Sequence, residues 1–525
     1  MTTEIDDINN NHLQKPQIFF NNVIFNDGTQ LNLQKNSIVV FTGPNNCGKS
    51  QVLKDLDRKL TSSNQASGII VKSARFEFLG SIDNPDFIDS LHGISFDMDN
   101  LQRYWNTKTL HPVIHNIFVK LLSTGSRLTV SNALARGSPT ESHPISILYK
   151  SEETAKKISD YYRQAFGVDL VVNRNGIHTI PLHIGQAPDK TAYTIDKQDI
   201  YYNLVNKLPK LQEQGDGMRS FASILLDTFT SGNTITLIDE PDAFLHPPQA
   251  RIIGRMLAKN NPDNRQLFIA THSEDFLQGL LDADSENVTV IRIVRNDNLN
   301  NMSILENKDI AELWDKPLLR YSNILSGLFH EKVVICESDY DCLFYQAILD
   351  AIYENPKGTS PDILFTHCGG KSRMKDVVSA LRAVNVPVVS ICDFDLLNSS
   401  HDFKQLAAAF GLDWNNQLDA SMQIIYNGIN ARNSTGNDVW KQLKKTGKHG
   451  LLGNEPAEYE AVEAVCQSVG LYIVPIGEIE SFERTINKEK RDWVYYILEN
   501  YDLSSEPKLE DARKFVQSFV DFIPT

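Results

Sequence analysis

The stretch SIVVFTGPNNCGKS (37–50) decides the fold of the N-terminal part of this chain. It begins with an apolar run typical of a buried strand and continues as a loop that matches G-x-x-x-x-G-K-[ST]. In such loops the backbone N–H groups surround phosphate oxygens at the N-terminus of the next helix. A helix is expected after residue 50, because apolar residues recur at helical spacing over 52–60. This strand-to-helix context favours a nucleotide site over a chance match in a glycine-rich turn.

The loop predicts which residues hold ATP and Mg²⁺. The ammonium group of Lys49 would reach the β- and γ-phosphates, and the hydroxyl of Ser50 would hold the metal ion. The nucleotide-binding residues expected from this loop are Gly43, Asn45, Asn46, Gly48, Lys49, Ser50 and Gln51.

Two later segments complete the predicted ATP site. TITLIDEP (234–241) reads as a buried strand that ends in two carboxylates. Asp239 would contact the Mg²⁺ shell, and Glu240 would orient and deprotonate the attacking water. FIATHS (268–273) places His272 just past another strand end, where it could contact the γ-phosphate. The alternatives are a turn at the acidic pair and a structural histidine, and the order of the motifs favours the ATPase.

The segment QGDGMRS (214–220) opens a helix and resembles, in degenerate form, the signature loop of ABC-type ATPases. In that family two heads enclose ATP, and the signature loop of one head contacts the nucleotide held by the other. The resemblance implies that Gly215 and Gly217 approach a bound nucleotide, with Arg219 as a candidate charge partner. It also implies self-association as a dimer or a higher oligomer.

The C-terminal part alternates strands with amphipathic helices, which predicts a parallel sheet. Strands are expected at 332–336, 363–366, 388–392 and 471–476. Acidic residues follow three of these strands, and they are Glu337, Asp339, Asp341, Asp393, Asp395, Glu478 and Glu480. Because parallel strands end at one edge of a sheet, these carboxylates are expected to form an oxygen cage for Mg²⁺ or Mn²⁺. Taken singly, each acid could be a solvated loop residue or a helix cap.

A glutamate after the first strand and D-x-D after the third resemble a Toprim domain. An ATPase head followed by Toprim is the layout of the OLD (overcoming lysogenization defect) family, and EPDAFLHPP (240–248) and VGLYIVPIGEIESFE (469–483) also resemble segments of that family. The resemblance implies metal ligands at Glu337, Asp341, Asp393 and Asp395, with Glu478 and Glu480 as further candidates. The chain departs from the family at Ser338, where glycine is usual, and this leaves the backbone geometry of that turn open.

The resemblance also implies a catalytic lysine, for which the sequence offers several candidates. HCGGKSRMK (367–375) contains Lys371 after a Gly-Gly turn. KQLKKTGKHG (441–450) contains Lys444, Lys445 and Lys448. The second run is either a solvated loop or a patch that contacts phosphate groups.

We therefore predict an α/β protein with an ABC-type P-loop ATPase head and a Rossmann-like Toprim domain. The ATPase is expected over 1–310, with a helical insertion or dimerisation arm at about 80–200. A connector is expected at 311–329, the Toprim domain at 330–485 and terminal helices at 486–525.

Composition places the chain in the cytosol. It has 41% hydrophobic and 22% charged residues, and no apolar run approaches the roughly 20 residues that cross a bilayer. The polar, acidic start is neither a signal nor a transit peptide, and the six cysteines form no CxxC pair. The net charge of −15 argues against binding nucleic acid by bulk electrostatics, although a local basic patch or a metal ion would still permit it.

These motifs predict an ATP-hydrolysing, metal-dependent endonuclease acting on DNA, with RNA left open as a substrate. By the family resemblance, we expect an effector of bacterial anti-phage defence, retron-associated or Gabija-like. A partner such as a reverse transcriptase with its nucleic acid is then implied, and no membrane. The alternative is a nucleotide-gated sensor or scaffold whose Toprim site does not cleave. A topoisomerase or primase fits less well, because no tyrosine-bearing cleavage domain or polymerising site is evident.

Overall fold

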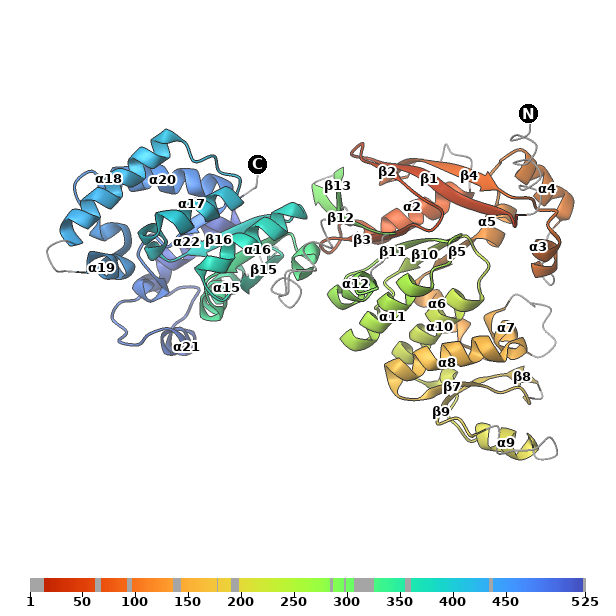
Figure 1. The fold of residues 1–525 in the computed structure, drawn as a ribbon. Helices are drawn as coiled ribbons and strands as arrows, with labels where there is room; N and C mark the ends of the chain where they lie inside the picture. Colours follow the sequence, from red (N-terminus) through yellow and green to blue (C-terminus); the bar gives the residue numbers. More distant parts are fainter. Residues whose placement is uncertain are drawn as a thin grey trace. The chain divides into compact units, whose positions relative to one another are not determined.

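The computed structural model describes residues 14–61, 68–91, 97–135, 143–176, 178–189, 198–283, 287–296, 299–305, 325–354, 360–433 and 438–522. The chain divides into two compact units, 1–308 and 309–525 (Figure 1). Most of the predicted connector falls outside the described residues, and its last part, Leu325–Phe329, is a short 3-10 helix. Within the described ranges, no helix has both the length and the apolarity needed to cross a bilayer.

A six-stranded sheet in the order β13-β12-β3-β11-β10-β5 forms the centre of the first unit. Its middle strands β3 (Ile38–Thr42), β11 (Gln266–Ala270) and β10 (Ile235–Asp239) are parallel and almost wholly buried, as their aliphatic sequences predict. The hairpin of β12 (Val288–Asn296) and β13 (Leu299–Leu305) extends one edge. Helix α2 (Lys49–Thr61) follows β3 through the glycine-rich loop.

Helices cover the sheet on the side opposite to α2. Figure 1 shows α10 (Asp216–Thr230), α11 (Pro247–Asn260) and α12 (Glu274–Leu281) on that face. Because β3 and β10 run parallel on either side of β11, the glycine-rich loop and Asp239 emerge at the same edge.

The segment predicted as a helical insertion, 80–200, contains strands as well as helices. Its strand β5 (Val119–Leu122) pairs in parallel with β10 and forms an edge of the central sheet. Four residues are too short to show a periodic pattern, which is why this strand was not predicted. The segment contains the helices α3 (Pro85–Ser90), α4 (Met98–Asn106), α5 (Pro112–Phe118), α6 (Thr124–Val130), α7 (Pro144–Lys150), α8 (Glu152–Phe166) and α9 (Gln198–Val205). It also contains two short antiparallel pairs, β6 (Leu134–Ala135) with β8 (Thr179–Ile180) and β7 (Asp169–Val172) with β9 (Leu182–Gly185).

An antiparallel sheet of β2 (Gln30–Asn32), β1 (Gln17–Phe25) and β4 (Val71–Leu79) packs above α2 in Figure 1. Two buried side chains of the central sheet bind the backbone of β1. The Gln266 amide accepts a hydrogen bond from Phe20 N at 2.8 Å and donates to Phe20 O and Gln34 O at 2.7 Å each. The hydroxyl of Thr234 donates to Ile18 O at 2.7 Å. These bonds satisfy backbone groups that a second sheet would otherwise leave without partners.

The second unit contains a parallel sheet in the order β15-β14-β16-β17. Its strands are β14 (Lys332–Cys336), β15 (Ile363–His367), β16 (Val388–Cys392) and β17 (Leu471–Ile473). Helices α15 (Asp339–Tyr353) and α16 (Lys371–Ala383) follow the first two strands, as predicted. The terminal helices α21 (Arg491–Asn500) and α22 (Glu510–Val520) contribute Trp493 and Phe519 to the core beside β14 and α15.

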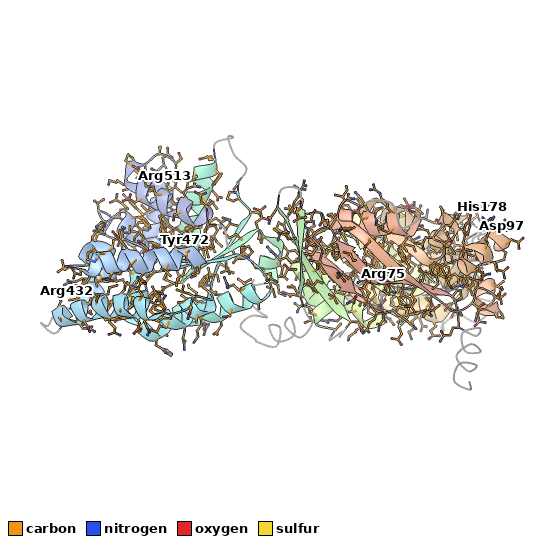
Figure 2. All side chains as sticks on the ribbon, turned by 90° about the horizontal axis from the view of Figure 1, so that it is seen from above. Arg75, Asp97, His178, Arg432, Tyr472 and Arg513 are labelled. Atoms are coloured by element: carbon orange, nitrogen blue, oxygen red, sulfur yellow. The ribbon has the colours of Figure 1, made fainter. Side chains whose placement is uncertain are left out.

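A long helical crossover joins β16 to β17. It consists of α17 (Ser400–Ala409), α18 (Asn416–Asn433), α19 (Val439–Thr446) and α20 (Glu455–Val469). Arg432 of α18 donates to the buried Glu455 of α20 at 2.9 Å, and Figure 2 marks Arg432 together with Tyr472 of β17 in this unit. A Cβ atom at Gly428 would lie 2.0 Å from a Glu455 oxygen, so a larger residue there would require the Glu455 side chain to move.

We expect Gln266→Leu to loosen the attachment of β1 to the central sheet. The change removes two hydrogen bonds to buried backbone groups of Phe20, each of which costs about 1–3 kcal/mol when left without a partner, and a third to Gln34 O. Hydrogen–deuterium exchange of the β1 amides should therefore speed up by roughly a hundredfold or more. Gln102→Ala, which removes an exposed amide, should leave exchange in β1 unchanged. Equal exchange in the two variants would contradict the role assigned to Gln266.

Candidate nucleotide and metal sites

The glycine-rich loop of the first unit owes its shape to two glycines with positive φ angles. Gly43 has φ 138°, and a Cβ there would lie 2.2 Å from Ile293 O. Gly48 has φ 106°, and a Cβ there would lie 2.4 Å from Ile70 Cδ1. Any larger residue at either position would move the loop.

Lys49 and Ser50 connect this loop to the neighbouring strands. The buried Lys49 ammonium donates to Gly43 O and Pro44 O at 2.7 Å each. The Ser50 hydroxyl donates to Asp239 Oδ1 at 2.8 Å, which joins the loop to the end of β10. Asn45 and Asn46 are exposed on the loop, whereas the Gln51 amide donates to Asp55 Oδ1 along α2.

The acidic end of β10 meets His272 at this edge. His272 Nε2 lies 3.7 Å from Glu240 Oε1. Burial and then the charge of Lys49 lower the pKa of His272, so the imidazole is neutral near pH 7 and offers one hydrogen-bond donor and one acceptor. The structure therefore gathers Lys49, Ser50, Asp239, Glu240 and His272, from three separate motifs, at one sheet edge.

Sequence reasoning missed one residue of this site, Arg127 of α6. Its guanidinium is fully buried and donates to Asp239 O at 2.5 Å and to Glu240 O at 2.7 Å. Glu240 has φ 49°, in the left-handed region that costs non-glycine residues on the order of 1–3 kcal/mol. Arg127 thus holds the strained turn of Glu240, and no motif in the sequence around it signals this contact.

The helix α10 begins at the segment that resembles a signature loop. Gly215 is its exposed N-cap residue, and a Cβ at Gly217 would lie 2.4 Å from Phe244 O. Arg219, the candidate charge partner, donates to Asp216 Oδ1 at 3.2 Å and to Leu128 O of the same chain. These contacts tie the start of α10 to α6 and to the loop after β10.

In the second unit, three carboxylates meet at the carboxyl ends of β14 and β16. One oxygen from each of Glu337, Asp393 and Asp395 lies within 4.8 Å of the others. A Glu337 oxygen also accepts a hydrogen bond from Asp393 N at 3.2 Å. Burial, and then the charge of Glu337, raise the pKa of Asp393 well above its usual range. Clustered oxygens of this kind suit Mg²⁺ or Mn²⁺, and the donor set fits the predicted ion.

Lys444 of α19 lies among these carboxylates. Its ammonium nitrogen is 3.3 Å from Asp395 Oδ2, 3.4 Å from Asp393 Oδ2 and 3.8 Å from Glu478 Oε2. Although burial opposes it, the two aspartates raise the pKa of Lys444, which stays charged at physiological pH. The end of α19 lies against the loop after β17: a Cβ at Gly477 would be 2.2 Å from Lys444 O, and one at Gly447 would be 2.2 Å from Pro475 O.

The other predicted ligands have different contacts. Asp341 Oδ2 accepts a hydrogen bond from Ser338 N at 2.9 Å, and Asp341 N donates to Ser338 Oγ at 3.3 Å, which together make a capping box at the start of α15. Asp341 does not belong to the carboxylate group found among the described residues. Ser338 itself has φ −132°, an extended conformation that any residue adopts, so the absence of glycine there introduces no strain. A Glu480 oxygen accepts from Lys490 N at 2.7 Å.

The remaining lysine candidates occupy separate places. Lys371 begins α16, directly after Gly370, whose amide donates to Glu337 O at 3.2 Å; its side chain lies outside the described part of the chain. Lys448 lies in the short helix Gly447–Gly450, its backbone donates to Pro475 O, and its charge acts on Glu463. Of the lysines in the 441–450 run, Lys444 is the one that forms ion pairs with the carboxylates.

Comparison with known proteins finds similarity in both units of the chain. Residues 328–395 match the family model "Overcoming lysogenization defect protein-like, TOPRIM domain", and residues 177–277 match "AAA domain, putative AbiEii toxin, Type IV TA system". These two matches confirm the predicted order of an ATPase domain followed by a Toprim domain. The predicted α/β fold class is confirmed with it.

Individual relatives cover parts of the chain. The Old nuclease of Escherichia phage P2 is 23% identical over 279 residues, which is 50% of this chain and 45% of that protein. The OLD nuclease of Thermus scotoductus is 26% identical over 172 residues, 30% of each chain. The chain thus spans less than half the length of these curated relatives. A solved SMC head domain, bound to the winged-helix domain of ScpA, covers 56% of this chain at 10% identity, with a TM-score of 0.37.

Substitutions in the second unit should distinguish the carboxylates that bind a metal ion from the aspartate that caps α15. We expect Asp393→Asn with Asp395→Asn to weaken Mn²⁺ binding by more than the roughly ten- to hundredfold that loss of an outer partner costs. Asp341→Asn should keep Mn²⁺ affinity, because its carboxylate caps α15. Titration calorimetry with Mn²⁺ measures both. If Asp341→Asn weakened binding as much as the double variant, Asp341 would be a ligand and the three-carboxylate set would be wrong.

Proposed function

We propose that this chain is an ATP-binding and ATP-hydrolysing, divalent-metal-dependent endonuclease that acts on DNA. The observation that carries the proposal is the convergence of Glu337, Asp393 and Asp395 around one point at a sheet edge, with Lys444 beside them. A cluster that only stabilised the fold would have no reason to gather three mutually repelling carboxylates.

Each residue of the Toprim site has a role in the proposal. Glu337, Asp393 and Asp395 would hold Mg²⁺ or Mn²⁺, which supplies an activated water and stabilises the leaving oxygen of a phosphodiester. Glu478 also lies near the Lys444 ammonium and is a further candidate ligand. Lys444 is the lysine we assign to the phosphate, because its charge already lies at the carboxylates.

The ATPase unit would use the residues gathered at its own sheet edge. Lys49 and the loop amides bind the phosphates, while Ser50 and Asp239 hold Mg²⁺. Glu240 positions the attacking water, and His272 beside it contacts the γ-phosphate. The exposed start of α10 at Gly215 would face the nucleotide of a second copy, so the active form is at least a dimer.

DNA is the substrate we propose, with RNA as an outcome of the test. The nuclease names of the two relatives support a nucleic-acid substrate. The net charge of −15 requires a local cationic contact with the phosphates, and the run of Lys444, Lys445 and Lys448 provides one next to the carboxylates. The charge distribution therefore directs the nucleic acid toward α19.

The proposal extends to the setting of the reaction. From the OLD-family layout we propose a role in bacterial anti-phage defence, with a partner such as a reverse transcriptase and its nucleic acid restraining the nuclease. We also propose a cytosolic location, which the six cysteine thiols support.

A nucleotide-gated scaffold that does not cleave is the second candidate. It is favoured by the position of Lys444, whose ammonium neutralises the carboxylates without a metal ion. In that case the Toprim unit would bind nucleic acid or a partner without cutting, and ATP would control the exposed surface.

Plasmid cleavage separates the two candidates. Purified chain is incubated with supercoiled plasmid and Mg²⁺ or Mn²⁺, with and without ATP. We expect nicked or linear product, lost in Asp393→Asn with Asp395→Asn while ATP hydrolysis continues, because the ATP site is built from other residues. Plasmid left intact under all conditions, with plasmid or RNA still bound, would favour the scaffold. Cleavage of RNA and not of plasmid would show that the substrate is RNA and that the proposed DNA substrate is wrong.

Glu240→Gln should keep ATP bound but slow its hydrolysis by roughly 10²–10⁴-fold, the usual contribution of a positioned base. The bound nucleotide should then stabilise the dimer, visible by light scattering. Lys49→Ala is the matched variant that should lose ATP binding itself. Hydrolysis by Glu240→Gln at the wild-type rate would show that Glu240 does not position the attacking water.

Lys444→Ala should reduce cleavage on the order of a hundredfold or more, since it removes a charge aimed at the reacting phosphate. Lys448→Ala, four residues away in the same basic run, should lose far less cleavage, because it removes a contact with bound DNA and not the charge at the carboxylates. Initial rates of plasmid nicking compare them. Equal losses in both variants would mean that the run binds DNA as a whole and that Lys444 has no special role.

A further inference from the structure

Arg127 connects three elements of the ATPase unit from a position with no solvent exposure. It lies on α6, in the segment that the sequence motifs did not explain. Two of its nitrogens reach Asp239 O and Glu240 O, and its Nε donates to Ser220 Oγ of α10 at 3.1 Å. Burial lowers the pKa of Arg127, which the nearby carboxylates of Asp239, Asp242 and Glu240 oppose. A buried guanidinium needs such partners, and here they belong to different motifs.

The contacts between α6 and α10 form a continuous set. The Ser223 hydroxyl of α10 donates to Arg127 O, and Arg219 of α10 donates to Leu128 O. Together with the bond from Arg127 to Ser220, they join two turns of α10 to two consecutive residues of α6. A shift of α10 along its axis therefore moves Arg127.

The other end of Arg127 holds the Glu240 turn. Glu240 has φ 49°, and its own N–H donates to Ala270 O at 2.8 Å while its carbonyl accepts from Arg127. A left-handed non-glycine residue keeps that conformation only while its neighbours hold it. Movement of Arg127 would therefore reorient the carboxylate of Glu240.

We infer that Arg127 is a positioning residue that couples α10 to Glu240, so that engagement of α10 by a second copy sets the hydrolytic geometry in the first. The inference rests on the proposed function, in which Gly215 at the start of α10 faces the nucleotide of the other copy. The nucleotide bound by one copy would then change the position of Glu240 in the other copy. Two ATP sites linked in this way hydrolyse ATP cooperatively.

The test uses the full chain and measures ATP hydrolysis against ATP concentration, with ATP affinity from binding of a fluorescent ATP analogue. Wild type should show a Hill coefficient above 1, toward the limit of about 2 for two coupled sites. Ser220→Ala with Ser223→Ala removes two of the links and should lower the coefficient to about 1 with analogue affinity kept. Arg127→Lys keeps the charge but loses the planar fork, and kcat should fall on the order of a hundredfold.

Thr228→Ala is the matched control, since its hydroxyl donates to Ile224 O within α10. It should keep both the rate and the Hill coefficient. Wild type that hydrolyses ATP with a coefficient of 1, or a serine double variant that keeps the wild-type coefficient, would overturn the coupling and leave the proposed ATPase standing. Wild type that binds but does not hydrolyse ATP would overturn the proposed function and the coupling with it.

Discussion

Parallel strands end at one edge of a sheet, and both units of this chain place their charged side chains there. In the first unit, the glycine-rich loop after β3 and Asp239 at the end of β10 meet through the Ser50 hydroxyl. In the second unit, Glu337 after β14 and Asp393 after β16 meet through a backbone hydrogen bond. The gathering of like charges that follows is unfavourable unless cations lie close by. In each unit, other elements of the fold place lysine or arginine side chains beside these carboxylates.

In the second unit, the helical crossover between β16 and β17 meets this requirement. It packs α18 on α20 through the Arg432–Glu455 ion pair and directs α19 toward the sheet edge. The backbone contacts at Gly447 and Gly477 leave no room for side chains, so the backbone at Lys444 is held close to the loop after β17. In the first unit, two cations lie near the acidic residues as Lys444 does in the second. Lys49 lies in the glycine-rich loop, and Arg127 binds the turn at Asp239 and Glu240. A cation on a rigid element offsets the repulsion between the carboxylates. It also gives the site a positive charge that can attract a phosphate group.

Local sequence patterns predicted the parts of both sites that lie next to a strand. Asp239, Glu337 and Asp393 each follow an apolar run directly, so a correct prediction of the strand also places the acidic residue at its carboxyl end. Lys444 and Arg127 reach their sites from distant segments; Arg127 is 112 residues from Asp239, and only the tertiary fold brings them together. Ser338 and Asp341 form an S-x-x-D pattern, which is a capping signal, and that pattern indicates the cap that Asp341 makes at the start of α15. The strand β5 was too short to predict.

The binding of a divalent ion by Glu337, Asp393 and Asp395 is the property on which the proposed nuclease chemistry depends. It can be tested with a crystal of the full chain soaked in Mn²⁺, with diffraction data collected at a wavelength where manganese scatters anomalously. We predict an anomalous peak in contact with carboxylate oxygens of these three residues, with the Lys444 ammonium displaced from its present distances of 3.3 and 3.4 Å to the aspartates. A peak at Asp341 or Glu480 instead, or an unoccupied cluster with Lys444 unmoved, would contradict this metal site.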